Sequence, residues 1–247
     1  MRHRLKFTVA YDGGAFAGWQ SQLHRKTVQD EIERAFHKIS GARVRVHGAG
    51  RTDTDVHALA QVAHVDLLDR KIAAARWPIA LNAVLPNTVR VLNCQYVSEK
   101  FHARYSAKGK TYRYRIFTGP ILPPLEFERA WHVAAPIDGD LLKRAAEIFV
   151  GRHDFKAFAA NRGTKPESTV RTIRSVRVRK SRELITIEIT GDGFLYKMVR
   201  LMVGAIVRVT QGKMELKEIA SALQSARAEH SRFVAPAEGL YLVKVWY

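Results

Sequence analysis

Cysteine is almost absent from this sequence, since Cys94 is the only one in 247 residues. A lone cysteine excludes an internal disulfide and any cysteine-rich zinc or iron–sulfur site, which suits a reducing compartment. Long apolar runs are missing as well. No uninterrupted stretch reaches the roughly 18 residues of a membrane-spanning helix, and no apolar run follows the basic start Met1–Arg4. We therefore expect a cytoplasmic protein that neither crosses a membrane nor is secreted.

Acidic residues are also scarce. The chain has 23 Asp and Glu against 41 Lys and Arg, which gives a formal net charge of +18. That excess is far larger than solubility requires, so it indicates a polyanionic partner such as a nucleic acid. The length is ample for a hydrophobic core in one large or two modest domains.

One short stretch, Gly50-Arg51-Thr52-Asp53-Thr54-Asp55-Val56-His57, concentrates reactive groups behind Gly48. Asp53 is a candidate nucleophile or base, and Arg51 is a candidate anion-binding group. The glycines permit a sharp turn or a close approach to a substrate. Because Asp, Thr and Gly are also ordinary turn residues, a solvated hairpin turn is the alternative.

The sequence around this stretch predicts a mixed fold. Alternating β-formers predict a strand over Leu5–Tyr11, and Thr27 is the expected N-cap of a helix. Its apolar face comprises Val28, Ile32, Ala35, Phe36 and Ile39. Further strands are expected at 43–48, 60–67 and 88–96, with a helix around 76–84. The reactive loop would then be held between two strands of a rigid sheet.

Residues 100–115 form a basic segment that contains no acidic residue. If 111–117 is a strand, its period of two places Tyr112, Tyr114 and Ile116 on one face and Arg113 and Arg115 on the other. Alternating cations and rings are typical of a nucleic-acid groove, in which phosphates meet the cations and bases stack on the rings. The alternative is a solvent-exposed basic strand whose tyrosines pack inward.

The second half predicts helices over 138–150, 196–210 and 215–226, and strands over 184–190 and 240–246. A further strand is crowded by a second basic stripe: Arg171, Arg174, Arg177, Arg179, Lys180 and Arg182. Arg200 lies in the middle of the most apolar helix. A cation there is costly, so it either extends to the surface or pairs with a carboxylate.

Short motifs occur in a characteristic order along nearly the whole chain. The first half contains Tyr11-Asp12-Gly13, Gly18-Trp19-Gln20, Thr27-Val28-Gln29, Gly50-Arg51-Thr52-Asp53 with Val56-His57 and Gln61, and Asn82 with Leu85-Pro86. The rest contains Phe101-His102-Ala103-Arg104, Tyr112-Arg113-Tyr114, His153-Asp154-Phe155, Met198-Val199-Arg200 with Gly204, and Ala237-Glu238-Gly239-Leu240-Tyr241-Leu242. In order and spacing, these motifs resemble the tRNA pseudouridine synthase A family.

The resemblance implies a fold and an assembly. The fold would be α+β, with two ferredoxin-like or RRM-like α/β halves whose antiparallel sheets meet across a central basic cleft, the pseudouridine synthase fold. The expected halves are 1–105, which carries the catalytic Asp loop, and 106–247, which completes the cleft. The resemblance also implies a homodimer.

The resemblance further implies isomerisation of uridine to pseudouridine in the anticodon stem-loop of tRNA, typically at positions 38 to 40, without a metal or a cofactor. Asp53 would be the catalytic carboxylate, Arg51 would flip the target base, and Arg200 would pair with Asp53. Tyr112 would lie against the uracil, and Leu240 would help to wall the pocket. Further candidates for substrate binding are Arg104, Arg113 and His57.

The residues suit this chemistry, because the reaction needs an ionised carboxylate and a dry pocket that retains the freed base. A cation within about 4–6 Å of Asp53 would lower the pKa of its carboxyl by roughly 1–3 units, which gives Arg200 a role. One residue departs from the family, which usually has Gly where this chain has Asp55. Aspartate tolerates the left-handed backbone conformation, although its charge could raise the pKa of Asp53 or weaken RNA binding.

Two rival functions remain open at this point. One is a catalytically weak tRNA-binding or chaperone module that keeps the basic cleft. The other is an Asp-dependent nucleosidase or hydrolase of free nucleotides, which leaves the basic stripes without a role. His57 and His64 with Asp66 match no standard spacing of metal ligands, so no metal is expected.

Overall fold

The computed structural model describes residues 3–161, 163, 167–225 and 233–247. The chain forms two compact units, which we describe in turn: unit 1 comprises residues 1–108 with 241–247, and unit 2 comprises residues 109–240. This division differs from the expected halves, 1–105 and 106–247, chiefly because residues 241–247 belong with the N-terminal residues. Unit 2 is thus an insertion within the sequence of unit 1.

Unit 1 is built on a sheet with the strand order β4-β1-β3-β10. The central strand β1 (His3–Tyr11) pairs antiparallel with β3 (His57–Leu67) and with β4 (Val89–Val97). β10 (Leu240–Trp246) lies parallel to β3, with Tyr241 opposite His57. The two-residue strand β2 (His47–Gly48) also pairs with β3 and leads into the reactive loop.

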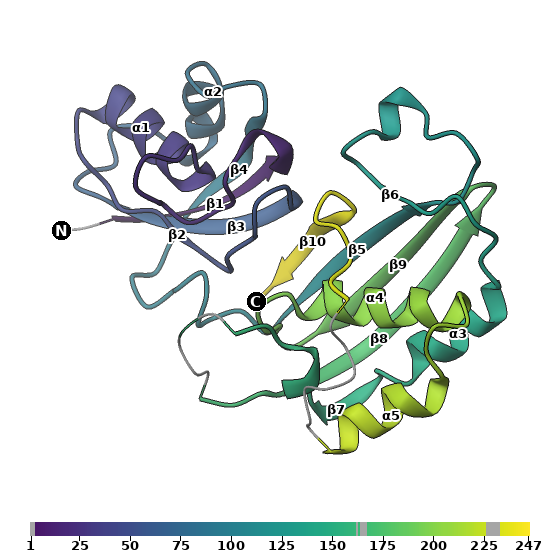
Figure 1. Cartoon of the computed structure of the whole chain (residues 1–247). Coiled ribbons are helices and arrows are strands. Elements are labelled where there is room, and N and C mark those ends of the chain that lie inside the picture. Colours follow the sequence, from purple (N-terminus) through teal and green to yellow (C-terminus); the bar gives the residue numbers. More distant parts are fainter. Residues whose placement is uncertain (1–2, 162, 164–166, 226–232) are drawn as a thin grey trace. The chain divides into compact units, whose positions relative to one another are not determined.

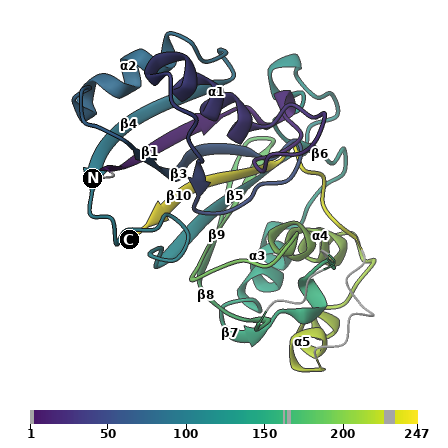
Figure 2. The ribbon, with the colours of Figure 1, turned by 90° about the vertical axis from the view of Figure 1, so that its left-hand side faces the viewer.

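Two helices, α1 (Val28–Ser40) and α2 (Trp77–Asn82), cover the same face of this sheet (Figure 1, Figure 2). The N-cap prediction is confirmed, since the Thr27 hydroxyl accepts a hydrogen bond from the Asp30 amide. The apolar face of α1 is confirmed at Phe36, whose ring contacts Phe7 and Trp77 at centroid distances of 5.7 and 5.1 Å. These contacts form the core of unit 1.

The strand predicted over 43–48 is wrong for its first four residues, because only His47–Gly48 is a strand. Side chains of α1 instead form hydrogen bonds with the backbone of Val46. The Val46 amide donates to the Glu33 carboxylate at 2.9 Å, and the Val46 carbonyl accepts from the Gln29 amide nitrogen at 3.2 Å. An alternating sequence cannot form a ladder when its backbone groups are already bonded to a helix.

Unit 2 has an antiparallel sheet in the order β5-β9-β8-β7. Its strands are β5 (Gly109–Phe117), β9 (Leu184–Gly191), β8 (Val170–Ser181) and β7 (Gly151–Asp154), with the short β6 (Trp131–His132) parallel to β5. The helices are α3 (Gly139–Glu147), α4 (Met198–Thr210) and α5 (Leu216–Ser225). The helix predicted over 215–226 is therefore observed from Leu216 to Ser225, while Glu215 lies before it and Ala226 lies outside the described residues.

The buried face of the unit 2 sheet is set by the period-two pattern of its strands. Ile185, Ile187 and Ile189 are all fully buried, and α3 and α4 lie over the same side of β8 and β9 (Figure 2). Short 3-10 helices complete the described chain at Gly13–Ala15, Ala74–Arg76, Pro124–Glu126 and Lys156–Phe158. The predicted α+β class with antiparallel sheets is confirmed. Among the described residues, no helix is both long enough and apolar enough to cross a membrane.

Candidate active site

The reactive loop, Gly50–His57, is anchored at its base by the sheet of unit 1. The Ala49 amide donates to the Val62 carbonyl at 2.7 Å, and the Gln61 side chain donates to the Gly50 carbonyl at 2.9 Å. Gln61 is fully buried on β3. The loop is therefore a held connection between β2 and β3, and the alternative of a simple solvated turn does not describe it.

The residue before Asp53 is fixed through both its side chain and its backbone. The Thr52 hydroxyl is hydrogen-bonded to the Tyr11 hydroxyl at 2.8 Å, and the Thr52 carbonyl accepts from the Trp19 amide at 3.1 Å. Burial raises the pKa of Tyr11, against the opposing effect of its hydrogen bonds to Thr52 and Gln61, so this phenol stays neutral. Tyr11 and Trp19 thus position the backbone that carries Asp53.

Glycines let a second loop, residues 13–18, press against the reactive loop. A Cβ atom added at Gly13 would lie 2.4 Å from the backbone carbonyl of Val56. One added at Gly18, where φ is +88°, would lie 2.7 Å from the Thr52 carbonyl oxygen. Any other residue at these positions would displace the reactive loop, so the close packing of the two loops requires glycine here.

Asp53 itself is half-buried, and Arg51 is exposed. The loop closes through the Asp53 carbonyl, which accepts from the Val56 amide at 3.2 Å. Asp55 has a φ of +63°, in the left-handed region. The loop therefore forms with aspartate at the position where glycine was expected. Aspartate tolerates this left-handed conformation better than most residues other than glycine.

His57, expected to contact substrate, is 4% exposed. Its Nδ1 atom accepts a hydrogen bond from the Gly13 amide at 3.0 Å, and its ring stacks on Tyr241 at a centroid distance of 4.6 Å. An Asp12 carboxylate oxygen lies 3.2 Å from the same nitrogen. These contacts within unit 1 favour a positioning role over direct contact with a substrate.

In unit 2, Arg200 is bonded to the segment that leads into β10. Its Nε atom donates to the Ala235 carbonyl at 2.7 Å, while its own carbonyl accepts from the Ala235 amide at 3.1 Å. The nearby Tyr114 hydroxyl donates to the Pro236 carbonyl at 2.7 Å. Burial and the Glu238 carboxylate raise the pKa of Tyr114, and the positive charge of Arg200 opposes them.

Leu240 ends this segment, and Tyr112 lies on β5 of the same unit. Leu240 is 6% exposed, and Gly239 before it lies so close to the Tyr114 ring that an added Cβ atom would be 2.7 Å away. Tyr112, on β5, is 8% exposed and meets the Phe194 ring edge to face at 5.0 Å. Unit 2 thus brings Arg200 and Leu240 to one segment, while Asp53, Arg51 and His57 share the loop of unit 1.

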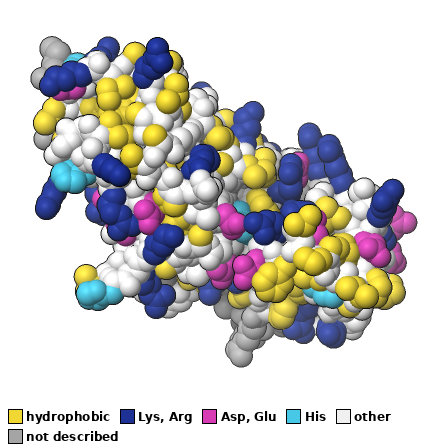
Figure 3. All heavy atoms as spheres, turned by 90° about the horizontal axis from the view of Figure 1, so that it is seen from above, with side chains coloured by type: hydrophobic (Ala, Val, Ile, Leu, Met, Phe, Trp, Pro, Cys, Tyr) yellow, Lys and Arg dark blue, Asp and Glu magenta, His cyan; other side chains and the backbone are white. Residues whose placement is uncertain are grey.

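The two remaining candidates for substrate binding differ in their surroundings. Arg104 is exposed in unit 1, with its guanidinium 5.7 Å from the centroid of the Tyr105 ring. Arg113, in unit 2, forms an ion pair with Glu188 across β5 and β9, at 2.6 Å. On the face shown in Figure 3, Lys and Arg side chains are dispersed among apolar and acidic ones. The described ranges contain no group of three or more His, Cys, Asp or Glu residues placed to hold a metal ion.

Comparison with known proteins decides the family. The family model described as tRNA pseudouridine synthase matches residues 8–106 and 145–247 of the chain. The chain belongs to this tRNA pseudouridine synthase family. A tRNA pseudouridine synthase A of Akkermansia muciniphila is 47% identical to this family member, covering 99% of this chain and 95% of the relative. The protein of the same name from Acetivibrio thermocellus is 43% identical, covering 98% and 99%.

The structure of this tRNA pseudouridine synthase family member also shows residues whose roles the sequence patterns did not assign. Tyr11 and Trp19 were quoted as motif residues only, yet both hold Thr52. Beside them, Arg25 and Lys26 line an open pocket next to the reactive loop. The sequence signal for Tyr11 and Trp19 is the pair of glycines, Gly13 and Gly18, at the ends of the loop between them. No comparable signal marks the pocket.

Proposed function

We propose that this protein is an isomerase that converts uridine to pseudouridine in tRNA, in the anticodon stem-loop and typically at positions 38 to 40. The observation that carries the proposal is a family match over residues 8–106 and 145–247 together with the rigidly held loop of Asp53. A loop fixed by side-chain, backbone and glycine contacts can present one carboxylate in a reproducible position.

The proposed reaction breaks the bond between uracil N1 and ribose C1′, rotates the uracil and joins C5 to C1′. The proton leaves C5, and N1 gains one, so no oxidant, reductant or water is consumed. Asp53 would act in its ionised form, either by attacking the nucleoside or by stabilising the cleaved state. In this proposal the protein needs neither a metal nor a small-molecule cofactor.

The other site residues take the following proposed roles. Arg51 assists the exit of the target base from its stack, a step that costs a few kcal/mol. Arg200 supplies a positive charge that pairs with the Asp53 carboxylate. Tyr112 packs against the uracil, and Leu240 helps to keep water from the base. Phosphate contacts are assigned to Arg104 and Arg113.

A homodimer that acts on tRNA in the cytoplasm, through a basic cleft between two halves, completes the proposal. Sedimentation of the purified protein tests the dimer directly. A strictly monomeric species at the concentrations used for activity would remove that part of the proposal and leave the chemistry standing.

The decisive experiment is the change Asp53→Ala in the full chain. Release of tritium from tRNA labelled at uracil C5 reports pseudouridine formation, because C5 loses its hydrogen when it bonds to C1′. We expect a loss of roughly 1,000-fold or more in rate, with tRNA affinity unchanged. Comparable turnover in this variant would overturn the assignment of Asp53.

The control is Asp69→Asn, which removes an exposed carboxylate of unit 1 and should leave the rate unchanged. The same assay separates the rival functions. A tRNA-binding module would bind the stem-loop and release no tritium even as wild type. A nucleosidase or hydrolase would liberate free uracil, which chromatography detects.

A further inference from the structure

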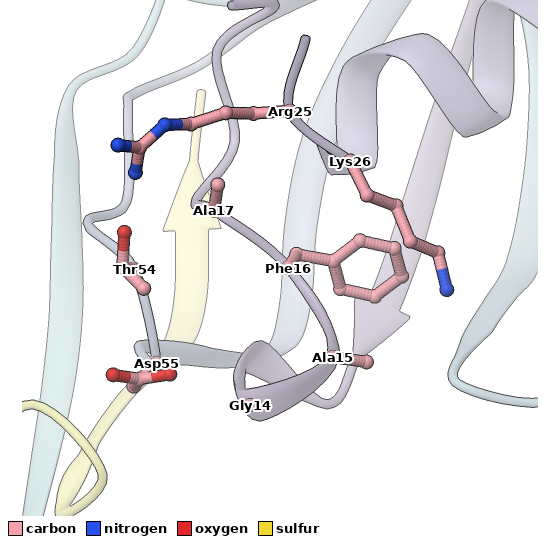
Figure 4. Close-up of a pocket in the computed structure, with 8 residues that line it drawn as sticks. All are labelled: Gly14, Ala15, Phe16, Ala17, Arg25, Lys26, Thr54 and Asp55. Carbon is pink, nitrogen blue, oxygen red and sulfur yellow. The ribbon is translucent and has the colours of Figure 1, made fainter.

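An open pocket lies in unit 1 beside the loop of Asp53 (Figure 4). It is a shallow depression with a volume of about 390 Å³ that is mostly open to solvent. The residues that line it come from three segments: Gly14, Ala15, Phe16 and Ala17, then Arg25 and Lys26, then Thr54 and Asp55. The function proposed above assigns no role to this pocket.

The pocket is fixed relative to Asp53 by covalent and packing constraints. Thr54 directly follows Asp53, so the wall of the pocket begins one residue from the proposed catalytic carboxylate, or about 3.8 Å along the backbone. The opposite wall, residues 14–17, is pressed against the same loop through the close contacts of Gly13 and Gly18. Whatever occupies the pocket therefore lies beside the backbone of the loop that carries Asp53.

The charged groups of the pocket are available for a ligand. Arg25, Lys26 and Asp55 are all exposed, and within the described part of the chain none of them forms an ion pair. The Lys26 ammonium lies 5.1 Å from the centroid of the Phe16 ring. Figure 4 shows the Arg25 guanidinium above Thr54, the Asp55 carboxylate below it, and Lys26 extending past the Phe16 ring.

The carboxylate restricts what the ligand can be. Two cations attract an anion such as phosphate, whereas Asp55 repels phosphate and needs a hydrogen-bond donor. Asp55 also occupies a left-handed position, with φ at +63°, that glycine would fill with less strain. A ligand that satisfies all three groups carries both a negative charge and a neutral donor. A nucleotide has both, in its phosphate and in its ribose hydroxyl or base amino group.

We propose that this pocket is a subsite for the nucleotide next to the target uridine, with Arg25 and Lys26 on the two phosphates that flank it and Asp55 accepting a hydrogen bond from its ribose 2′-hydroxyl or base amino group. This inference rests on the proposed function. It makes Asp55 a specificity-determining residue for the sequence or sugar beside the target. Arg25 and Lys26 contribute affinity, since phosphate contacts carry no sequence information.

The first test removes the cations in the full chain, as Arg25→Met, Lys26→Met and the double variant. The rate of tritium release against stem-loop concentration gives KM and kcat. We expect KM to rise roughly 3- to 10-fold for each single change and further for both, with kcat within about twofold, because the lost contacts bind substrate and transition state equally. The salt dependence of binding should weaken by about 0.7–0.9 log units per decade for each lost phosphate contact.

The controls are Lys38→Met and Arg43→Met, which remove exposed cations elsewhere in unit 1. They should leave KM and the salt dependence unchanged. A double variant with the wild-type KM and salt dependence would overturn the phosphate subsite. An equal rise of KM in the controls would also overturn it, since the effect would then belong to net charge alone.

The second test changes Asp55→Gly, which suits the left-handed backbone and removes only the carboxylate, and Asp55→Asn. Stem-loops are prepared with a single 2′-deoxy nucleotide, or with a base that lacks its amino group, at each position flanking the target. Wild type should lose roughly 10-fold in kcat/KM on one of these substrates, a typical value for a base or hydroxyl contact. Asp55→Gly should react equally with the modified and unmodified stem-loops.

The two arms identify the donor. If the kcat/KM of wild type falls with the 2′-deoxy nucleotide, the donor is the ribose 2′-hydroxyl. If it falls with the altered base, the donor is the base amino group. If wild type and Asp55→Gly respond identically to every stem-loop, Asp55 does not read the substrate. Failure of the proposed function can be told apart from failure of the subsite, because wild type would then release no tritium from any stem-loop.

Discussion

Two basic regions of this molecule hold their charges in opposite ways. In unit 2, the arginines of β5 have acidic partners: Arg113 pairs with Glu188 at 2.6 Å, and Arg115 pairs with Glu126 at 2.7 Å. In unit 1, Arg25 and Lys26 face an open pocket and have no acidic partner within the described residues. The sequence marks the first region strongly and the second hardly at all.

The difference shows that a Lys or Arg residue in a basic stretch of sequence is not always available to bind a partner, because it can be paired with an acid elsewhere in the chain. Residues 100–115 contain no acid, yet the acids that meet β5 arrive from β9 and from residues 124–126. The tyrosines of β5 are also committed, since Tyr114 is fully buried and Tyr112 is 8% exposed. The tyrosines of this strand therefore pack inward, and its arginines are paired with acids instead of standing free in solvent.

The largest effect should come from breaking the backbone packing that supports the unit 1 region. Gly13→Ala places a Cβ atom against the Val56 backbone, so the Asp53 loop must shift. We expect the rate of pseudouridine formation to fall roughly 100-fold and the free energy of unfolding to fall by about 1–3 kcal/mol.

The matched control is Gly139→Ala at the start of α3, where an added Cβ atom meets nothing within 4 Å. Tritium release and urea unfolding should both stay at wild-type values there. If Gly13→Ala kept full activity, the loop would not depend on the close packing of residues 13–18.

An effect of intermediate size should appear at acidic pH, where unit 1 should lose stability before unit 2. Burial, followed by the charges of Arg4, His102 and His47, lowers the pKa of His64 on β3 to about 4, against the weaker opposing effect of Asp66. Its Nδ1 atom accepts from the Ala103 amide at 3.2 Å, a bond that the protonated ring cannot make. The unfolded chain therefore binds more protons than the folded chain between pH 6.5 and 4.

Stability should accordingly fall as the pH drops through that window, by roughly 1–3 kcal/mol. Hydrogen exchange followed by mass spectrometry should show residues 57–67 of unit 1 losing protection before residues 184–191 of unit 2. His64→Gln should flatten the pH dependence, whereas His37→Gln, on the exposed side of α1, should retain it. Equal loss in both units at every pH would contradict the assignment to His64.

The smallest effect should come from releasing a paired cation in unit 2. Glu188→Gln leaves Arg113 with a neutral neighbour, so the phosphate contact proposed for Arg113 no longer competes with a carboxylate. We expect stem-loop affinity to rise about two- to threefold and the salt dependence to steepen by less than about 0.7–0.9 log units per decade, the value for one full phosphate contact. The ion pair is partly exposed, at 37% and 24%, so stability should change by less than about 1 kcal/mol.

Glu147→Gln, which removes an exposed carboxylate at the end of α3, is the control for overall charge. The same gain in both variants would show that net charge alone matters. No gain in Glu188→Gln would mean that Arg113 does not reach phosphate, and the assignment of Arg113 to substrate binding would have to be abandoned.

Much of the fold could be predicted because its elements have strong local signals. The final strand was predicted over 240–246, and these are its bounds in the structure. The first helix was predicted from Thr27, which caps it. The strand over 43–46 was wrong, and at Val46 the side chains of Glu33 and Gln29, two residues of α1, bind the backbone groups that a strand would have used. No local pattern reports such a contact.

The candidate site divides in the same way. Asp53 and Arg51 could be selected because reactive groups cluster within eight residues. The pocket could not, because it arises where residues 14–17, 25–26 and 54–55 meet, and no one of these segments reports that the other two lie beside it. The buried bond between Tyr11 and Thr52 likewise joins residues 41 positions apart. Sequence separation of this size hides a contact from any argument based on periodicity.

The pairing of β10 with β3 has a consequence for how the protein is made. Residues 241–247 complete the sheet of unit 1, where the Tyr247 hydroxyl donates to the Ala103 carbonyl and Tyr241 stacks on His57. A ribosome that has synthesised the first 108 residues has therefore not yet supplied every strand of that unit. Unit 1 must wait, partly assembled, until the whole of unit 2 has emerged, and the loop of Asp53 gains its last support only when residues 241–247 have been synthesised.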